Sequence, residues 1–198
     1  MPRISEARRE QRRAEIVDAA LRCFVRNGYQ RTSMADIIAE SGLSAGAIYG
    51  YFPGKSELVR SAAARILAGR REEIAAAGAT RALSPAEIAR MLVDGIRREA
   101  PLAVLVQVWG EATVDEELRD LVREPLEVVH ETVATNLERW ALEHPDRIPA
   151  GAAARTWAHE SAPVLMGLVP GFVLQRALRP GFDEETFLRA IGTLLPAD

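Results

Sequence analysis

Few side chains in this chain are suited to catalysis or metal binding. The histidines are His130, His144 and His159, and none has the His-x-x-x-His or Glu-x-x-His spacing, with the partners, that a metal site on a helix needs. The single cysteine, Cys23, has no evident base beside it that would activate it as a nucleophile. The sequence therefore predicts no metal site and no cofactor, and we expect that the protein is not an enzyme.

Binding chemistry is concentrated in residues 32–55, where two short helices are predicted. Ser33 and Asp36 have the spacing of a capping box, in which each side chain accepts a hydrogen bond from a free backbone N–H group at a helix start. Gly42 favours the left-handed conformation that ends a helix. Ser44 is placed to cap the second helix. We expect a helix, a tight turn and another helix.

The second helix has an apolar inner face and a lean outer face. Leu43 and Ile48 have the spacing of a hydrophobic staple, which fixes the angle between the helices, and Phe52 lies four residues after Ile48 on the inner face. The outer face carries small residues and a tyrosine, and a major groove of DNA admits one helix of this kind. Nearby N–H groups and hydroxyls would contact phosphates. The predicted DNA-binding residues are Thr32, Ser33, Ser44, Ala45, Gly46, Tyr49, Gly50, Tyr51 and Lys55. The alternative is an ordinary helical hairpin with half-buried tyrosines.

These residues resemble the TetR family of bacterial transcriptional repressors. The resemblance rests on Gly46, Ile48-Tyr49, Tyr51-Phe52, Lys55 and Leu58 and extends over residues 8–65, with weaker similarity at residues 107–112 and 167–178. One departure is Gly50, where many family members carry a larger polar side chain that can contact bases. Because Gly50 offers no such contact, we expect sequence discrimination to depend on Tyr49, on the N-terminal arm and on DNA shape.

Charge is distributed unevenly along the chain. Residues 1–60 hold ten basic and seven acidic side chains, a balance of +3, whereas residues 61–198 hold fifteen and twenty-one, a balance of −6. The basic residues near the start could form an arm on the DNA backbone or in the minor groove, or could simply be the solvated start of a helix. They are Arg3, Arg8, Arg9, Arg12 and Arg13.

Composition and the N-terminus bear on localisation. A hydrophobic content of 48% with 27% charged residues is typical of a globular domain, and we count no run near the roughly 20 apolar residues that span a bilayer. The start of the chain has no apolar signal-peptide core. Cys23 fits a buried inert thiol better than a redox sensor. A cytoplasmic protein without a membrane segment is expected.

The fold class predicted by the helical periodicity is all-α. We expect a helix-turn-helix DNA-binding domain at residues 1–56 and a larger helical domain for ligand binding and dimerisation at residues 57–198. The first helix should end at residues 27–28, and the helix that connects the two domains should end near Ala77. Ser84 with Glu87 predicts the next helix start.

The second half should contain four further helical segments. An apolar segment runs from Pro101 through Trp109, and Asp115 should cap a long helix at residues 116–143, with Pro125 kinking or dividing it. Residues 152–178 resume the helical pattern, interrupted by Pro163 and Pro170. Asp183 should cap the last helix.

The last two helices carry the predicted dimer interface. Gly167 and Gly171 lie four residues apart, where the missing side chains would let a helix of a second subunit approach closely; packing within the chain is the alternative. Two copies on two half-sites of a palindrome would raise affinity. The predicted interface residues are Gly167, Gly171, Phe172, Leu188, Ile191 and Leu195.

A ligand cavity in the helical body follows from the resemblance, which implies an inducer that changes the spacing of two DNA-binding heads. Large apolar residues that could line the cavity, or simply fill the core, are Met91, Val104, Leu105, Val108, Trp109, Trp140, Trp157 and Met166. Polar residues that could orient a ligand, or lie on the surface, are Gln107, Glu111, His130, His159 and Glu160.

Together these observations predict a regulator that binds a double-stranded DNA operator. The resemblance implies a homodimeric repressor that a small hydrophobic effector releases from a palindromic operator. A helical regulatory protein that acts through protein contacts rather than DNA is the alternative.

Overall fold

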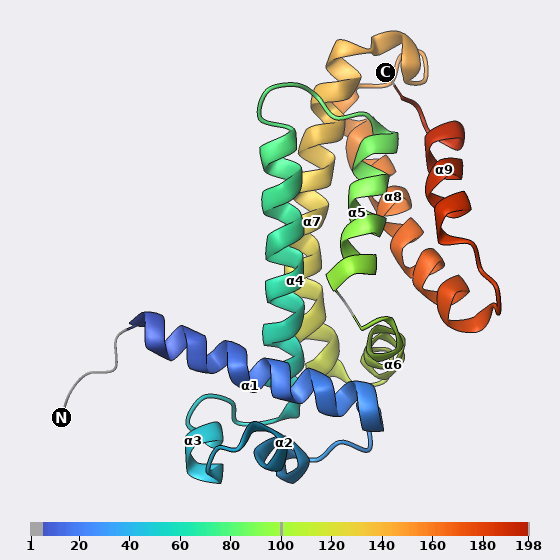
Figure 1. Ribbon diagram of the computed structural model, residues 1–198. Helices are drawn as coiled ribbons and strands as arrows, with labels where there is room; N and C mark the ends of the chain where they lie inside the picture. The colour runs from blue at the N-terminus through green and yellow to red at the C-terminus, as the bar shows by residue number, and fades with distance from the viewer. Residues whose placement is uncertain (1–5, 100, 198) are drawn as a thin grey trace. The chain divides into compact units, whose positions relative to one another are not determined.

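The chain folds into helices joined by short connections (Figure 1). The computed structural model describes residues 6–99 and 101–197, and within these ranges there is no strand, as the all-α prediction requires. The elements are α1 (Glu6–Asn27), α2 (Met34–Ser41), α3 (Ala45–Tyr49), α4 (Lys55–Ala77), α5 (Pro85–Glu99), α6 (Leu102–Ala112), α7 (Glu116–Glu143), a 3-10 turn η1 (Pro145–Arg147), α8 (Ala154–Leu178) and α9 (Glu184–Leu194).

The helices form two compact units. Unit 1 contains the chain up to Arg65 together with Ala103–Arg123, and unit 2 contains Ile66–Leu102 and the chain from Glu124 onward. The unit boundaries therefore fall inside α4 and α7, and most of α6 belongs to unit 1. The predicted functional division at residues 56–57 lies in the first turn of α4 and stays a prediction.

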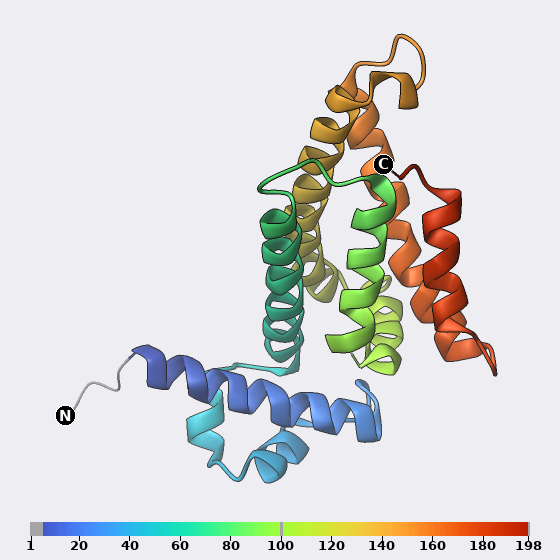
Figure 2. The same ribbon diagram turned by 45° about the horizontal axis from the view of Figure 1, so that its top comes forward.

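Unit 1 is built on the apolar face of α1. Ile16, Ala20 and Phe24 are buried at three- to four-residue spacing, and α1 packs against α2 (Figure 2). Glu40 of α2 accepts hydrogen bonds from Arg22 at 2.7 Å and from Arg26 at 2.9 Å. Apolar packing and the ion pairs of Glu40 with Arg22 and Arg26 thus hold α2 against α1.

Unit 2 is organised around α5, which contacts both α8 and α9 (Figure 1). The predicted start of α5 is confirmed, because the Ser84 amide donates to the Glu87 carboxylate at 2.9 Å and the Glu87 amide donates to the Ser84 hydroxyl at 3.4 Å. Between α8 and α9, the ring of Phe172 lies 5.7 Å from that of Phe182 and 5.4 Å from that of Phe187. This aromatic cluster joins the last two helices.

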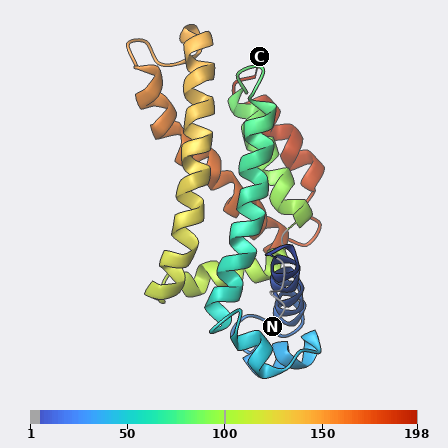
Figure 3. The ribbon, with the colours of Figure 1, turned by 90° about the vertical axis from the view of Figure 1, so that its left-hand side faces the viewer.

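Three prolines lie inside helices without dividing them; the predicted kink at Pro125 stays a prediction. Helix α7 is capped by Asp115, as expected, and runs undivided through Pro125 to Glu143 (Figure 3). Helix α8 likewise contains Pro163 and Pro170 without a break, so the predicted interruptions are wrong. A proline removes one backbone hydrogen bond, and a long helix held by tertiary packing tolerates that loss.

Because α8 is continuous, it has to be considered as a candidate membrane-spanning helix. In the described part of the chain, α8 is long and apolar enough to cross a membrane by length and composition, although core helices of soluble proteins pass the same test. The prediction of no membrane segment did not extend to α8, because Pro163 and Pro170 were expected to interrupt this helix. Only 22% of the apolar stretch is buried within the chain, so α8 exposes much apolar surface.

Candidate nucleic-acid interface

The start of α2 is fixed by the predicted capping box. The Ser33 hydroxyl accepts a hydrogen bond from the Asp36 amide at 3.2 Å, and the Asp36 carboxylate accepts one from the Ser33 amide at 2.8 Å. Hydrogen bonds from the Ser33 backbone and side chain lower the pKa of Asp36. At the other end Gly42 adopts the left-handed conformation, with φ of 67°. Both ends of α2 are as predicted.

Helix α3 is a single short turn held from both sides. Ser44 caps it by accepting a hydrogen bond from the Ala47 amide at 3.3 Å. The helix ends at Tyr49, before Phe52, yet the Phe52 amide still donates to the Ile48 carbonyl at 2.9 Å. Ile48 and Phe52 are both fully buried, so the predicted inner face is confirmed.

The order Gly-x-Ser-x-Gly at residues 42–46 matches the sequence of a hydrolase nucleophile elbow. That elbow requires a strand before the serine, and here α2 and a turn precede Ser44. Its hydroxyl is the cap of α3. The match therefore does not indicate an enzyme.

The outer face of α3 is open, as a groove-binding helix requires. Ser44, Ala45 and Gly46 are exposed, and Tyr49 is 51% exposed. A Cβ added at Gly46 would meet no atom within 4 Å. Gly50 is exposed and Tyr51 is half-buried. Small residues and one projecting phenol thus form a surface that can approach another molecule closely.

Lys55, the only lysine of the chain, has a structural role that the sequence analysis missed. Its ammonium group donates hydrogen bonds to the carbonyls of Tyr29 at 2.7 Å, Gln30 at 3.2 Å and Thr32 at 3.1 Å. It also lies 4.3 Å from the centre of the Tyr29 ring. Burial lowers the pKa of Lys55. The start of α4 is therefore tied to the α1–α2 connection, and a phosphate contact by Lys55 would have to share this ammonium.

Thr32 departs from the prediction that it contacts phosphate. It is 2% exposed, and its hydroxyl donates towards the carbonyls of Gly28 at 2.7 Å and Cys23 at 3.2 Å. The buried hydroxyl stabilises the connection after α1 and cannot reach a ligand. Ser33, in contrast, is exposed, with its hydroxyl engaged in the cap of α2.

The basic residues near the start serve different purposes. Arg13 donates to the Tyr51 carbonyl at 3.5 Å and to the Ser61 hydroxyl at 3.3 Å, and its guanidinium lies 4.6 Å from the centre of the Phe52 ring. It therefore anchors α1 to the segment after α3. Arg9 and Arg12 stay available to an arm, although Arg12 pairs with Glu15 at 2.8 Å. Arg3 lies outside the described residues.

Cys23 is fully buried on α1. Burial raises the pKa of its thiol, and nearby Arg26 opposes this change. A raised thiol pKa disfavours the reactive thiolate. The structure supports the inert-thiol interpretation.

The predicted ligand-pocket residues do not share one environment. In unit 2, Trp140 is fully buried, with its ring 4.8 Å from that of His144 and 5.8 Å from that of Trp157. Met91, Trp157 and Met166 are half-buried. Val104, Leu105, Val108 and Trp109 belong to unit 1, where Val104 and Val108 are buried. The assignment of these eight residues to one pocket stays a prediction.

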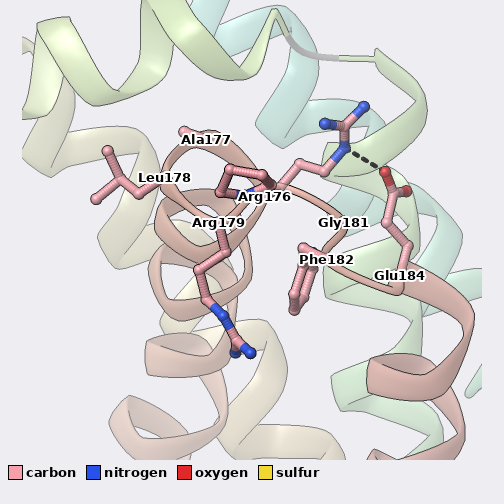
Figure 4. A pocket seen from close by; sticks show the side chains of 8 residues that line it. Arg176, Ala177, Leu178, Arg179, Gly181, Phe182 and Glu184 are labelled. Carbon is pink, nitrogen blue, oxygen red and sulfur yellow. Dashed lines mark hydrogen bonds and ion pairs between the residues drawn. The ribbon is translucent and has the colours of Figure 1, made fainter.

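A surface hollow of about 420 Å³ lies at the α8–α9 turn of unit 2, away from every predicted pocket residue. Figure 4 shows Arg176 directed towards Glu184, with which it forms an ion pair, and Phe182 and Arg179 lining the same hollow. The residues around it are Arg176, Ala177, Leu178, Arg179, Pro180, Gly181, Phe182 and Glu184. The hollow is open, Arg176 pairs with Glu184 and Arg179 donates to the Gln175 side-chain oxygen, so we do not assign it a ligand.

The predicted dimer residues divide into buried and open positions. Phe172 and Ile191 are buried in the core of unit 2, so the prediction that they contact a second subunit is wrong. Leu188 and Leu195 are half-buried. A Cβ added at Gly167 or Gly171 would meet nothing within 4 Å, which argues against the alternative that these glycines serve packing within the chain.

Comparison with known proteins shows what this segment is similar to. A family model described as bacterial regulatory proteins of the tetR family matches residues 16–62. The transcriptional regulator YfiR of Bacillus subtilis is 39% identical over 59 residues, which span 30% of this chain and only 29% of that relative. An uncharacterised regulator of Mycobacterium tuberculosis, Rv2912c, is 25% identical over 100% of this chain and 99% of its own. The repressor AcnR of Corynebacterium diphtheriae is 27% identical over 70% of each chain.

Solved structures share the fold over nearly the whole length. The regulator FadR of Bacillus subtilis, in complex with stearoyl-CoA, has a TM-score of 0.73 and 18% identity over 91% of this chain and 96% of its own. A regulator of Saccharomonospora viridis in complex with choline has a TM-score of 0.66 and 22% identity over 93% and 95%. The sequence relatives above are named as transcriptional regulators, in line with the expectation that the protein is not an enzyme. Residues 16–62, which hold the capped helix-turn-helix, are thus similar to bacterial regulatory proteins of the tetR family.

Proposed function

We propose that the protein is a sequence-specific DNA-binding repressor whose α3 enters the major groove. The single observation that carries this proposal is the open outer face of α3, where Tyr49 projects beside Ala45 and Gly46 while Ile48 and Phe52 anchor the helix from below. A repressor role is supported by AcnR, which is named a repressor. The site of action would be the cytoplasm, where bacterial DNA lies.

The composition of α3 limits how it can read bases. It contains no Arg, Lys, Asn or Gln, the side chains that form bidentate contacts with guanine or adenine. Base contacts by α3 would come from the Tyr49 hydroxyl and from small apolar groups on thymine methyls. The remaining specificity would come from DNA shape and from basic residues of α1.

Selection of bound duplexes from random DNA tests this proposal. The recovered duplex is then titrated against the wild type and Tyr49→Ala by fluorescence anisotropy at several salt concentrations. We expect binding that weakens steeply with salt, and a loss of at least tenfold in affinity for Tyr49→Ala. Leu142→Ala, which truncates an exposed apolar side chain of α7, should bind like the wild type. Failure to enrich any duplex would favour regulation through protein contacts.

We further propose that two copies pair through α8. Its exposed apolar and glycine positions recur at alternating three- and four-residue spacing, which forms one stripe along the helix. The stripe consists of Val164, Gly167, Gly171, Leu174 and Leu178. A membrane-spanning helix would be apolar on every side, whereas one stripe fits a partner helix. A second copy would also place two α3 helices on two half-sites of a palindrome.

Light scattering at micromolar concentration tests the dimer. The wild type should have the mass of two chains, and Gly167→Glu should shift it towards the mass of one. The matched control is Thr135→Glu, at an exposed position of α7, which should keep the mass of two chains. A second glycine such as Gly151 would not serve, because its φ of 80° disfavours any side chain. A monomeric wild type would exclude the pairing.

The effector is proposed to be a small hydrophobic molecule bound by the helical body. Its identity does not follow from the fold, because the two structures compared above hold stearoyl-CoA and choline. By linkage, an effector that prefers the DNA-incompetent state weakens DNA binding by the same factor by which DNA weakens effector binding. Titrating the protein–duplex complex with an acyl-CoA and with choline tests both chemistries. Release by neither, despite binding to the protein, would argue against effector control by these two classes.

A further inference from the structure

The side chain of Gln107 in α6 contacts the connection between α1 and α2. The Gln107 side-chain oxygen accepts a hydrogen bond from the Tyr29 amide at 2.7 Å. Both residues belong to unit 1, although 78 positions separate them in the sequence. The contact is therefore long-range and rests on the position of α6.

Gly28 makes room for this contact. A Cβ at Gly28 would lie 2.9 Å from the Gln107 side-chain oxygen, closer than a real Cβ allows. Gly28 also has φ of 82° and ends α1, where its amide donates to the Phe24 carbonyl at 2.8 Å. The amide that follows points at Gln107 because the chain turns here.

Tyr29 is the residue on which these contacts converge. Its amide is held by Gln107, and its carbonyl and ring are held by Lys55. Its ring also lies edge-on to Phe24, with ring centres 5.4 Å apart. One buried residue thus joins α1, α4 and α6, directly before the capped start of α2.

A second residue of α6 acts on the same place. Glu111 lies four residues after Gln107, on the same face of the helix. Burial lowers the pKa of Lys55, and the Glu111 carboxylate opposes that change. Burial raises the pKa of Tyr29, and Asp115 and then Glu111 add to the rise. Glu111 therefore lies near both partners of the Tyr29–Lys55 contact.

We propose that Gln107 is a positioning residue that couples α6 to the DNA-binding helices through Tyr29 and Lys55. The reason to expect coupling is the course of the chain. Helix α6 lies in unit 1, while the segments before and after it, α5 and most of α7, belong to unit 2. A displacement of either segment pulls on α6 through the backbone. The Gln107–Tyr29 contact then transmits that displacement to the start of α2 or breaks. This inference rests on the proposed DNA-binding function only in its second test, which measures the effect of added DNA on α6.

The first test is amide hydrogen exchange measured by NMR on the full chain without DNA. Gln107→Ala removes the acceptor, and we expect exchange of the Tyr29 amide to become about threefold to tenfold faster, the range for loss of one hydrogen bond. Gln107→Glu keeps an acceptor and should restore slow exchange. Gln175→Ala removes a side-chain amide of α8 that accepts a hydrogen bond from Arg179, and it should leave Tyr29 unchanged. Unchanged Tyr29 exchange in Gln107→Ala would overturn the contact.

The second test separates coupling from simple stabilisation. Adding the selected duplex to the wild type should slow exchange of the α6 amides, and this effect should disappear in Gln107→Ala and return in Gln107→Glu. An equal effect of DNA in Gln107→Ala would overturn the coupling. If the wild type binds no duplex, the proposed function fails, while the first test still decides whether the contact exists.

Discussion

Replacing Lys55 by methionine tests whether the lysine supports the fold before any DNA is bound. Methionine keeps most of the apolar length of the side chain and removes the ammonium group that donates to three carbonyls. The carbonyl of Gln30 is exposed, so water replaces the lysine there at little cost. The carbonyls of Tyr29 and Thr32 are partly buried and lose a charged donor.

The expected loss can be estimated from these contacts. Two partly buried carbonyls that lose their donor cost about 1 kcal/mol each, and loss of the ammonium from the Tyr29 ring costs about 0.5 kcal/mol. Relief of the cost of burying the ammonium, which lowers its pKa, offsets part of this. We expect a decrease of about 2 kcal/mol in the free energy of unfolding, or about 4–8 °C in Tm for a chain of this size.

Urea unfolding followed by circular dichroism measures this loss. Arg65→Met is a matched control, because Arg65 is an exposed cation with one ion pair to Asp18 at 2.8 Å and should contribute less than about 1 kcal/mol. Lys55→Arg should also destabilise the protein, since a planar guanidinium cannot converge on three carbonyls as a compact ammonium does. Wild-type stability of Lys55→Met would refute the reasoning and return Lys55 to a purely phosphate-binding role.

Three further predictions concern stability. Arg81, and then Ser84, lower the pKa of Glu87 from 4.5 to about 2. The stability that this carboxylate contributes should therefore be complete above about pH 4.5 and be lost as the pH falls towards 2. Acid titrations of the free energy of unfolding should show a smaller loss in Glu87→Gln than in the wild type. Gly78→Ala should destabilise the protein by about 1–3 kcal/mol in urea unfolding, because the new Cβ would lie 2.2 Å from the Asn136 side-chain oxygen. Gly50→Ala should increase the free energy of unfolding by about 0.4–1 kcal/mol and so raise Tm slightly, since φ is −70° and the nearest atom to the new Cβ is a helix carbonyl at 3.3 Å. A lower Tm would show that α3 needs this glycine.

Local signals in the sequence located most helix ends correctly. Ser33 with Asp36, Ser44, Ser84 with Glu87, Asp115 and Asp183 all cap helices, because capping depends on residues within one turn of each other. The predicted breaks at the prolines of α7 and α8 were wrong for the opposite reason. Their cost is local, whereas the packing that outweighs it comes from distant segments.

The roles of single side chains were harder to predict, because they depend on contacts far along the sequence. Thr32 and Lys55 have residue types suited to phosphate, and only the fold shows that the Thr32 hydroxyl is buried and that the lysine binds carbonyls. Gln107 was considered a possible ligand contact, and it binds Tyr29 instead. Phe172 and Ile191 lie on helices with apolar residues on more than one face, so periodicity could not tell the core from an interface.

The most direct test of the central proposal is the affinity of Gly46→Leu for the selected duplex, measured by anisotropy beside the wild type. Gly46 is exposed and a Cβ there meets no atom within 4 Å, so leucine should leave Tm unchanged or slightly higher. If the lean face of α3 enters the groove, the added side chain should reduce affinity by at least tenfold. Equal affinity of the folded variant and the wild type would contradict this account of α3.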